Sequence, residues 1–219
     1  MVSYTDPGAQ ELSREPEEDR ANPTNHMDSA IAQMDLQREE CLRKSRDLIK
    51  MCARTIHAIH QGRAHQEMID DCTRQRDALS ATFGNLPPEN APQGAYLQSM
   101  QEYCEALIVW RFSLGEDVPD ISLLGTGPIA YLYGLSDAIG ELRRMAVQAL
   151  LDGDLKSARE TLNTMDSMFN MLMEVGEYGI AKSLKNKRDQ ARNTLERTRA
   201  DVMRAAVQGT PIRGDRVES

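Results

Sequence analysis

One long segment without a helix breaker constrains the fold of this chain more than any other feature. Residues 28–61 contain neither glycine nor proline, and their apolar side chains recur at helical spacing. Aromatic residues make up only 5% of the chain, and no stretch alternates polar with β-branched residues as a half-buried strand does. The sequence therefore predicts an all-α protein that begins with one long helix.

Glycines and prolines divide the remainder into further helical segments. We expect helices over about residues 64–82, 96–114, 128–151, 155–175 and 180–207, with breaks at Gly62, residues 84–88, residues 115–128 and Gly153. The segment 96–114 is apolar nearly all round, so we expect it to be central and buried. The resulting prediction is a single-domain antiparallel bundle of six or seven helices.

The two ends of the chain differ in composition from the segment between them. Residues 1–25 contain Pro7, Pro16 and Pro23, an acidic run and few apolar residues, which predicts a disordered acidic tail. Residues 209–219 are predicted to be a flexible C-terminus, which leaves residues 26–208 as the helical domain. No apolar run approaches the roughly 20 residues that cross a bilayer, and the N-terminus lacks the layout of a signal peptide. We expect a soluble cytoplasmic protein without a membrane partner.

The four cysteines are scattered through predicted helices without a CxxC pair. They are expected to be small core residues, not a disulfide or zinc framework: Cys41, Cys52, Cys72 and Cys104.

Net charge restricts where the chain can bind a polyanion. Its value of -8 opposes binding over the whole surface, so a nucleic-acid site must be a local basic stripe or an interior lining. One such stripe, at three- and four-residue spacing on the first helix, consists of Arg43, Arg46, Lys50 and Arg54. A merely solvated helix face is equally consistent with this pattern. A later cluster, balanced by Asp189 and Glu196, predicts a surface ion-pair network and contains Lys182, Lys185, Lys187, Arg188 and Arg192.

Two pairs of carboxylates have the spacing of a candidate cation site. Glu102 and Glu105 are three residues apart on the most apolar predicted helix, which places both on one face of it. Asp137 and Glu141 are one turn apart on the next long helix. Partly buried carboxylates repel one another unless a proton or a cation separates them, and hard cations prefer oxygen ligands. Four such ligands on two packed helices are suited to Mg²⁺ or Mn²⁺.

Spacing alone favours a structural interpretation of the same residues. In that interpretation Glu141 pairs with Arg144, while Glu102 and Glu105 satisfy neighbouring helices. A transition-metal site is not favoured at the histidines either, because no cysteine or carboxylate completes a standard ligand set around His57, His60 and His65.

Three blocks of sequence resemble the translin/TRAX family. Residues 101–106 (QEYCEA) are similar to the family signature that carries two catalytic glutamates. Residues 127–145 (GPIAYLYGLSDAIGELRRM) resemble the helix that supplies an aspartate and a glutamate four residues apart, here Asp137 and Glu141. Residues 44–57 (KSRDLIKMCARTIH) resemble the long first helix of the family. The similarity covers about residues 28–205 in the same order.

This resemblance implies a fold, a site and an activity. It implies that Glu102, Glu105 and Asp137 hold Mg²⁺ and that Glu141 completes the site as a ligand or by orienting water. Since translin itself lacks the full set of carboxylates, their retention resembles TRAX, the nuclease subunit. The family also implies a closed, hollow homo-oligomer that binds RNA inside, with a translin-like paralogue as a further candidate partner.

Three hypotheses about function follow. The first is a magnesium-dependent endoribonuclease that cleaves single-stranded RNA with a metal-activated water. The alternative is a non-catalytic, translin-like protein that binds single-stranded RNA or DNA. A third is a helical scaffold without a nucleic-acid role. Salt-dependent oligonucleotide binding separates the scaffold from the other two, and cleavage separates the enzyme from the binder.

Overall fold

The computed structural model describes residues 23–88, 90–176 and 184–208, and within these ranges all regular structure is helical. The helices are α1 (Pro23–His60), α2 (Gln66–Gly84), α3 (Gln93–Ser113), α4 (Ile121–Leu124), α5 (Pro128–Leu151), α6 (Leu155–Glu174) and α7 (Leu184–Gln208). The predicted all-α bundle of six or seven helices is confirmed. None of the described helices combines the length and the apolar character needed to cross a membrane. Of the predicted N-terminal tail, residues 1–25, the last three belong to α1, while residues 1–22 lie outside the described residues. The predicted C-terminal tail, residues 209–219, and the predicted start of the last helix at residue 180 also lie outside them.

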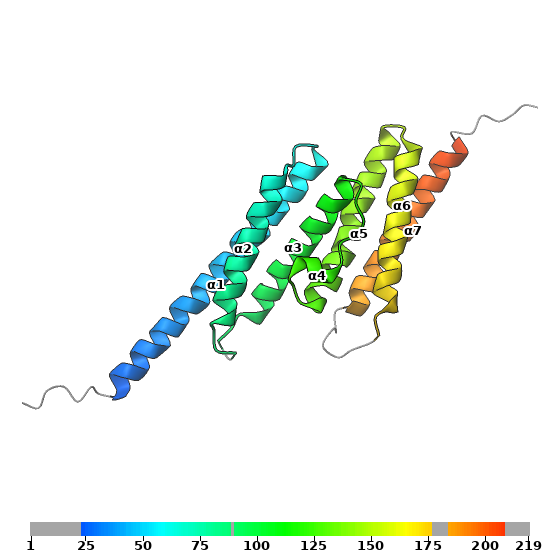
Figure 1. The fold of residues 1–219 in the computed structure, drawn as a ribbon. Helices are drawn as coiled ribbons and strands as arrows, with labels where there is room; N and C mark the ends of the chain where they lie inside the picture. The colour runs from blue at the N-terminus through cyan, green and yellow to red at the C-terminus, as the bar shows by residue number, and fades with distance from the viewer. Residues whose placement is uncertain (1–22, 89, 177–183, 209–219) are drawn as a thin grey trace, which may run out of the picture.

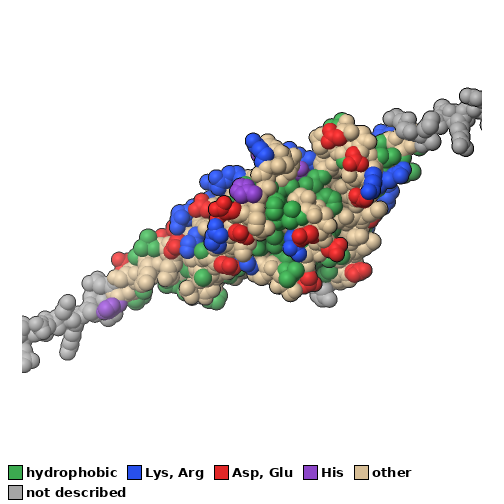
Figure 2. Space-filling view, turned by 45° about the horizontal axis from the view of Figure 1, so that its top comes forward, with side chains coloured by type: hydrophobic (Ala, Val, Ile, Leu, Met, Phe, Trp, Pro, Cys, Tyr) green, Lys and Arg blue, Asp and Glu red, His purple; other side chains and the backbone are tan. Residues whose placement is uncertain are grey.

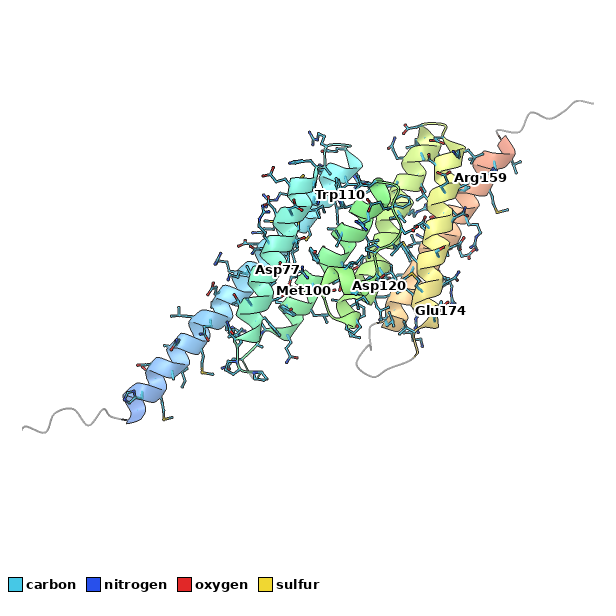
Figure 3. All side chains as sticks on the ribbon, viewed as in Figure 1. Asp77, Met100, Trp110, Asp120, Arg159 and Glu174 are labelled. Carbon is cyan, nitrogen blue, oxygen red and sulfur yellow. The ribbon has the colours of Figure 1, made fainter. Side chains whose placement is uncertain are left out.

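The long helices lie side by side in a row. The α1–α2 pair packs against α3, α3 packs against α5, and α5 packs against the α6–α7 pair (Figure 1). The first half of α1 extends beyond the other helices (Figure 1). Met100 and Trp110, labelled in Figure 3, lie on α3 in the middle of this row and are almost fully buried. The prediction that this apolar helix is central is therefore confirmed.

Among consecutive long helices of the described ranges, α3 and α5 depart from the predicted antiparallel order, because they run in the same direction (Figure 1). Gln101 in the first half of α3 bonds to Asp137 of α5, and Phe112 near the end of α3 lines a pocket with the later α5 residue Met145. The connection from residue 114 to residue 127 makes this possible. At up to about 3.3 Å per extended residue, it is long enough to return along the length of α3.

Helix α4 interrupts that crossover and was not predicted from the sequence. Asp120 caps it by accepting a hydrogen bond from the Ser122 amide at 2.8 Å, and Gly125 ends it with a φ of +60°. The hydroxyl of Tyr131 donates to the carbonyl of Pro119 at 3.0 Å and so fastens the crossover to α5. A helix of four residues is too short to show an apolar period.

The backbones of α3 and α5 approach closely at Gly134. A β-carbon at this position would lie 2.6 Å from the β-carbon of Cys104, 2.7 Å from the carbonyl oxygen of Gln101 and 3.0 Å from the amide nitrogen of Glu105. Only glycine fits this contact without movement of one helix. All four cysteines, including Cys104, are buried and free, as predicted.

We expect Gly134→Ala to lower the free energy of unfolding by about 1–3 kcal/mol, because the added methyl group overlaps the backbone of α3. Gly140→Ala is the matched control on the same helix, since a β-carbon there would meet no atom within 4 Å. That control should raise stability by about 0.5–1 kcal/mol, the usual gain for alanine in a helix. Urea unfolding of both variants measures the difference, and equal stabilities would contradict the close contact.

Candidate active site

The structure brings the four predicted carboxylates to the junction of α1, α3 and α5. Because α3 and α5 are parallel, Glu102 and Glu105 follow one another along α3 in the same direction as Asp137 and Glu141 along α5. The two pairs therefore face each other. A pocket of about 310 Å³ opens beside them. Its lining consists of Ala53, Ile56, His57, Glu102, Glu105, Glu141 and Arg144. Two motifs far apart in sequence thus form one acidic site.

Glu105 is the most buried of these carboxylates, with 9% of its surface exposed. It makes no hydrogen bond or ion pair with another described residue. Burial raises the pKa of Glu105 to about 8, and the charges of Asp137, Glu102 and Glu141 act in the same direction. Burial, followed by the charge of Asp137, also raises the pKa of Glu102. Both α3 carboxylates therefore favour a bound proton or a nearby cation.

The two α5 carboxylates already have partners. The ammonium group of Lys187 contacts Asp137 Oδ1, and the amide of Gln101 donates to Asp137 Oδ2 at 2.5 Å. His60 of α1 bonds through Nε2 to Glu141 Oε2. His60 and Lys187 come from the two flanking helix pairs, so the α5 carboxylates are contacted from both sides.

These contacts correct two interpretations drawn from spacing. Glu141 bonds to His60 and not to Arg144, which is exposed on the pocket rim. Of the late basic cluster, Lys187 faces Asp137, and Arg188 donates to the carbonyls of Leu172 and Val175. Arg192 lies over the ring of Phe169 at 5.8 Å, and the carboxylate of Glu196 pairs with Arg199. Lys182 lies outside the described residues. The predicted ion-pair network with Asp189 and Glu196 is therefore wrong for the described members of the cluster.

Sequence reasoning missed His60 and Lys187 as residues of the site. His60 was considered only with its neighbours His57 and His65, whose side chains point to Gln61 and Glu67 instead. Lys187 is 50 residues from Asp137, and no local pattern connects them. Gln101 could have been identified as a site residue from the sequence, because it precedes Glu102 in the QEYCEA block.

The side chains of the site offer oxygen ligands to a metal ion. Within the described ranges, no three histidine, cysteine, aspartate or glutamate side chains are arranged as a metal centre. Nonetheless, the chemistry of the site fits a hard divalent cation, since it offers carboxylate oxygens and the buried Glu105 has no partner. Thiolates and paired imidazoles, which softer metals prefer, do not line the pocket.

The predicted basic stripe lies on the exposed face of α1. All four of its members are exposed: Arg43, Arg46, Lys50 and Arg54. Arg43 pairs with Asp47 at 3.5 Å, and Arg54 donates to the carbonyl of Lys50 at 3.3 Å. Lys50 precedes the pocket residues Ala53 and His57 by three and seven positions, so one face of α1 connects the stripe to the pocket. Over the face shown in Figure 2, basic and acidic side chains are otherwise interspersed.

Comparison with known proteins agrees with this arrangement. The model of the translin family matches residues 36–209. The chain belongs to the translin family. An uncharacterized protein of Methanocaldococcus jannaschii is 29% identical over 186 residues, covering 82% of this chain and 81% of that protein. The resemblance drawn from the three sequence blocks is thereby confirmed.

Solved structures place this translin-family chain beside C3PO proteins. The crystal structure of AfC3PO has a TM-score of 0.73 at 26% identity, covering 86% of this chain and 99% of that chain. A structure of AfC3PO with duplex RNA has a TM-score of 0.68 at 27% identity, covering 86% and 98%. Apo-NeC3PO, at 17% identity and a TM-score of 0.71, covers 83% and 96% and supports the fold.

Glu105 should make the metal-free protein less stable as pH rises. Its pKa is raised in the folded state, so its stabilising contribution is present below the unfolded pKa and is lost between about pH 4.5 and 8. Between pH 5 and pH 8, we expect the free energy of unfolding of Glu105→Gln to rise by roughly 2–5 kcal/mol relative to that of the parent protein. Urea unfolding with chelator measures this gain. Exposed Glu67→Gln is the control, and parallel pH profiles for parent and Glu105→Gln would contradict the prediction.

Proposed function

We propose that this translin-family protein is a magnesium-dependent endoribonuclease that cleaves single-stranded RNA, with Mn²⁺ as the alternative cation. The observation that carries the proposal is Glu105, a buried carboxylate without a partner beside three other carboxylates at an open pocket. A structural role does not explain it, because glutamate is rarely buried unless paired. A cation between α3 and α5 would remove the repulsion.

The residues of the site have distinct roles in this proposal. Glu102, Glu105 and Asp137 hold the cation, and Glu141 serves as a further ligand or orients water. His60 positions Glu141 through its Nε2 contact and is itself largely buried. A bound Mg²⁺ would supply an activated water and would stabilise charge on the phosphate of bound RNA. Gln101 fixes the orientation of Asp137 from the α3 side.

The basic residues of α1 supply the RNA-binding surface in the proposal. Lys50 and Arg54 lie next to the pocket on an exposed helix face, and the exposed guanidinium of Arg144 lies on its rim. Lysine and arginine on such a surface contact phosphates without reading sequence. The AfC3PO structure with duplex RNA supports RNA as the ligand class, and single-stranded DNA remains the alternative nucleic acid.

A second candidate function also has a specific observation in its favour. Lys187 and His60 already satisfy Asp137 and Glu141 without a metal ion. Such pairing suits a non-catalytic protein that binds RNA and keeps its carboxylates for structure. The two candidates share the basic stripe and differ only in whether RNA is cut.

A closed homo-oligomer, alone or with a translin-like paralogue, remains a prediction. Its assembly would require apolar surface, and α1 and α7 expose Met27, Ile31, Leu36, Met203 and Val207. The first three lie on the half of α1 that extends beyond the bundle (Figure 1).

Cleavage of a labelled single-stranded RNA tests the proposal. The parent protein should cut with Mg²⁺ and not with chelator, and Glu105→Gln should reduce the rate by about 100-fold or more, because a cation ligand is lost. Glu67→Gln, an exposed change on α2, is the matched control and should cut like the parent. RNA affinity measured in chelator should differ between the variants by no more than about twofold, because the α1 stripe is unchanged.

Cutting that persists in chelator, or that Glu105→Gln retains, would contradict the metal-dependent enzyme. Tight binding without cutting by the parent would support the non-catalytic binder instead. A duplex of the same sequence tests the preference for single strands.

A further inference from the structure

Lys187 occupies an unusual position for a lysine in the first turn of a surface helix. Its ammonium group contacts Asp137 Oδ1, and its side chain is only 19% exposed. The hydroxyl of Ser136 donates to its carbonyl oxygen at 3.1 Å, so its backbone is also held against α5. The same ammonium lies 6.0 Å from the ring centre of Tyr133. Two adjacent turns of α5 thus hold Lys187 at the acidic centre.

Asp137 has both carboxylate oxygens engaged. Lys187 contacts Oδ1, and Gln101 donates to Oδ2. Glu102 and Glu105, which face it from α3, make no hydrogen bond or ion pair with another described residue. Lys187 therefore pairs with Asp137, which is one of the carboxylates proposed to bind the cation.

We propose that Lys187 is a resident counter-ion of Asp137 that competes with a divalent cation for this carboxylate and so sets the metal concentration at which the site is loaded. This inference rests on the proposed metal-dependent function. It assigns Lys187 as a positioning residue that acts on Asp137, separate from the carboxylates that bind the cation.

The positive charge of Lys187 disfavours the binding of a divalent cation at Asp137. A cation that shares Asp137 Oδ1 with an ammonium group meets like-charge repulsion at close range in a partly buried site. Loading the site therefore requires Lys187 to leave Asp137. In the metal-free state the same ammonium offsets part of the repulsion among the four carboxylates, and it lowers the pKa of both Glu102 and Glu105.

The surroundings allow the ammonium to move without unfolding α7. The Ser136 bond holds the backbone of Lys187 and not its side chain. The face of the Tyr133 ring, on α5, offers the displaced ammonium a second contact. Lysine's four-carbon stem turns readily about its single bonds. Metal loading then changes one side-chain contact and leaves the helix packing intact.

Binding of Mn²⁺, followed by electron paramagnetic resonance of the free ion, tests the proposal with the full chain. Lys187→Met keeps an unbranched side chain of similar length but removes the ammonium group that contacts Asp137. It should bind Mn²⁺ about tenfold more tightly than the parent. Lys187→Arg, which restores a cation, should bind as weakly as the parent. Lys185→Met is the matched control, because Lys185 is exposed on the same turn of α7, and it should not change the affinity.

The outcomes separate this inference from the proposed function. One outcome is that the parent binds Mn²⁺, that Glu105→Gln abolishes this binding, and that Lys187→Met binds no more tightly than the parent. This outcome would contradict the competition but support the metal site. Lack of saturable Mn²⁺ binding in parent and Lys187→Met alike would overturn the metal site and the competition together. If Lys187→Met does not fold, the comparison uses Lys187→Gln, for which the same tighter binding is expected and unchanged binding counts against the proposal.

Discussion

The close contact of α3 with α5 at Gly134 is the constraint on which the candidate site depends. A β-carbon there would overlap the α3 backbone beside Gln101, Cys104 and Glu105, so glycine sets how near the two helices lie. The crossover through α4 makes the helices parallel, and their carboxylates therefore follow the same order along the contact. An antiparallel connection would place the two carboxylate pairs in opposite order. Helix packing and crossover direction together create the acidic centre.

Four carboxylates in one centre destabilise the metal-free protein, and the structure offsets this in three ways. Burial and neighbouring charges raise the pKa of Glu105 to about 8, which favours its neutral form near neutral pH. Lys187 places an ammonium on Asp137, and His60 bonds to Glu141. A core built for stability alone would place apolar side chains here. Conflict between local stability and residue choice is typical of functional sites.

Most of the fold followed from local pattern, and part of the site did not. The helix predicted over about residues 128–151 agrees with α5, because Pro128 begins the helix and Gly153 follows its end. The carboxylates were identified from their spacing and from family resemblance, since i, i+3 and i, i+4 pairs are visible in sequence. The parallel course of α5 and the contacts of Lys187 and His60 depend on packing between distant segments, which leaves no short-range pattern.

The most direct test of the central claim is a crystal structure of the protein grown with Mn²⁺, with anomalous scattering recorded at the manganese edge. If the site binds a cation, an anomalous peak lies between α3 and α5, within coordination distance of oxygens of Glu102, Glu105 and Asp137. In that structure the ammonium of Lys187 has left Asp137. Fully ordered carboxylates without such a peak, or with Lys187 still on Asp137 at saturating Mn²⁺, would contradict the account.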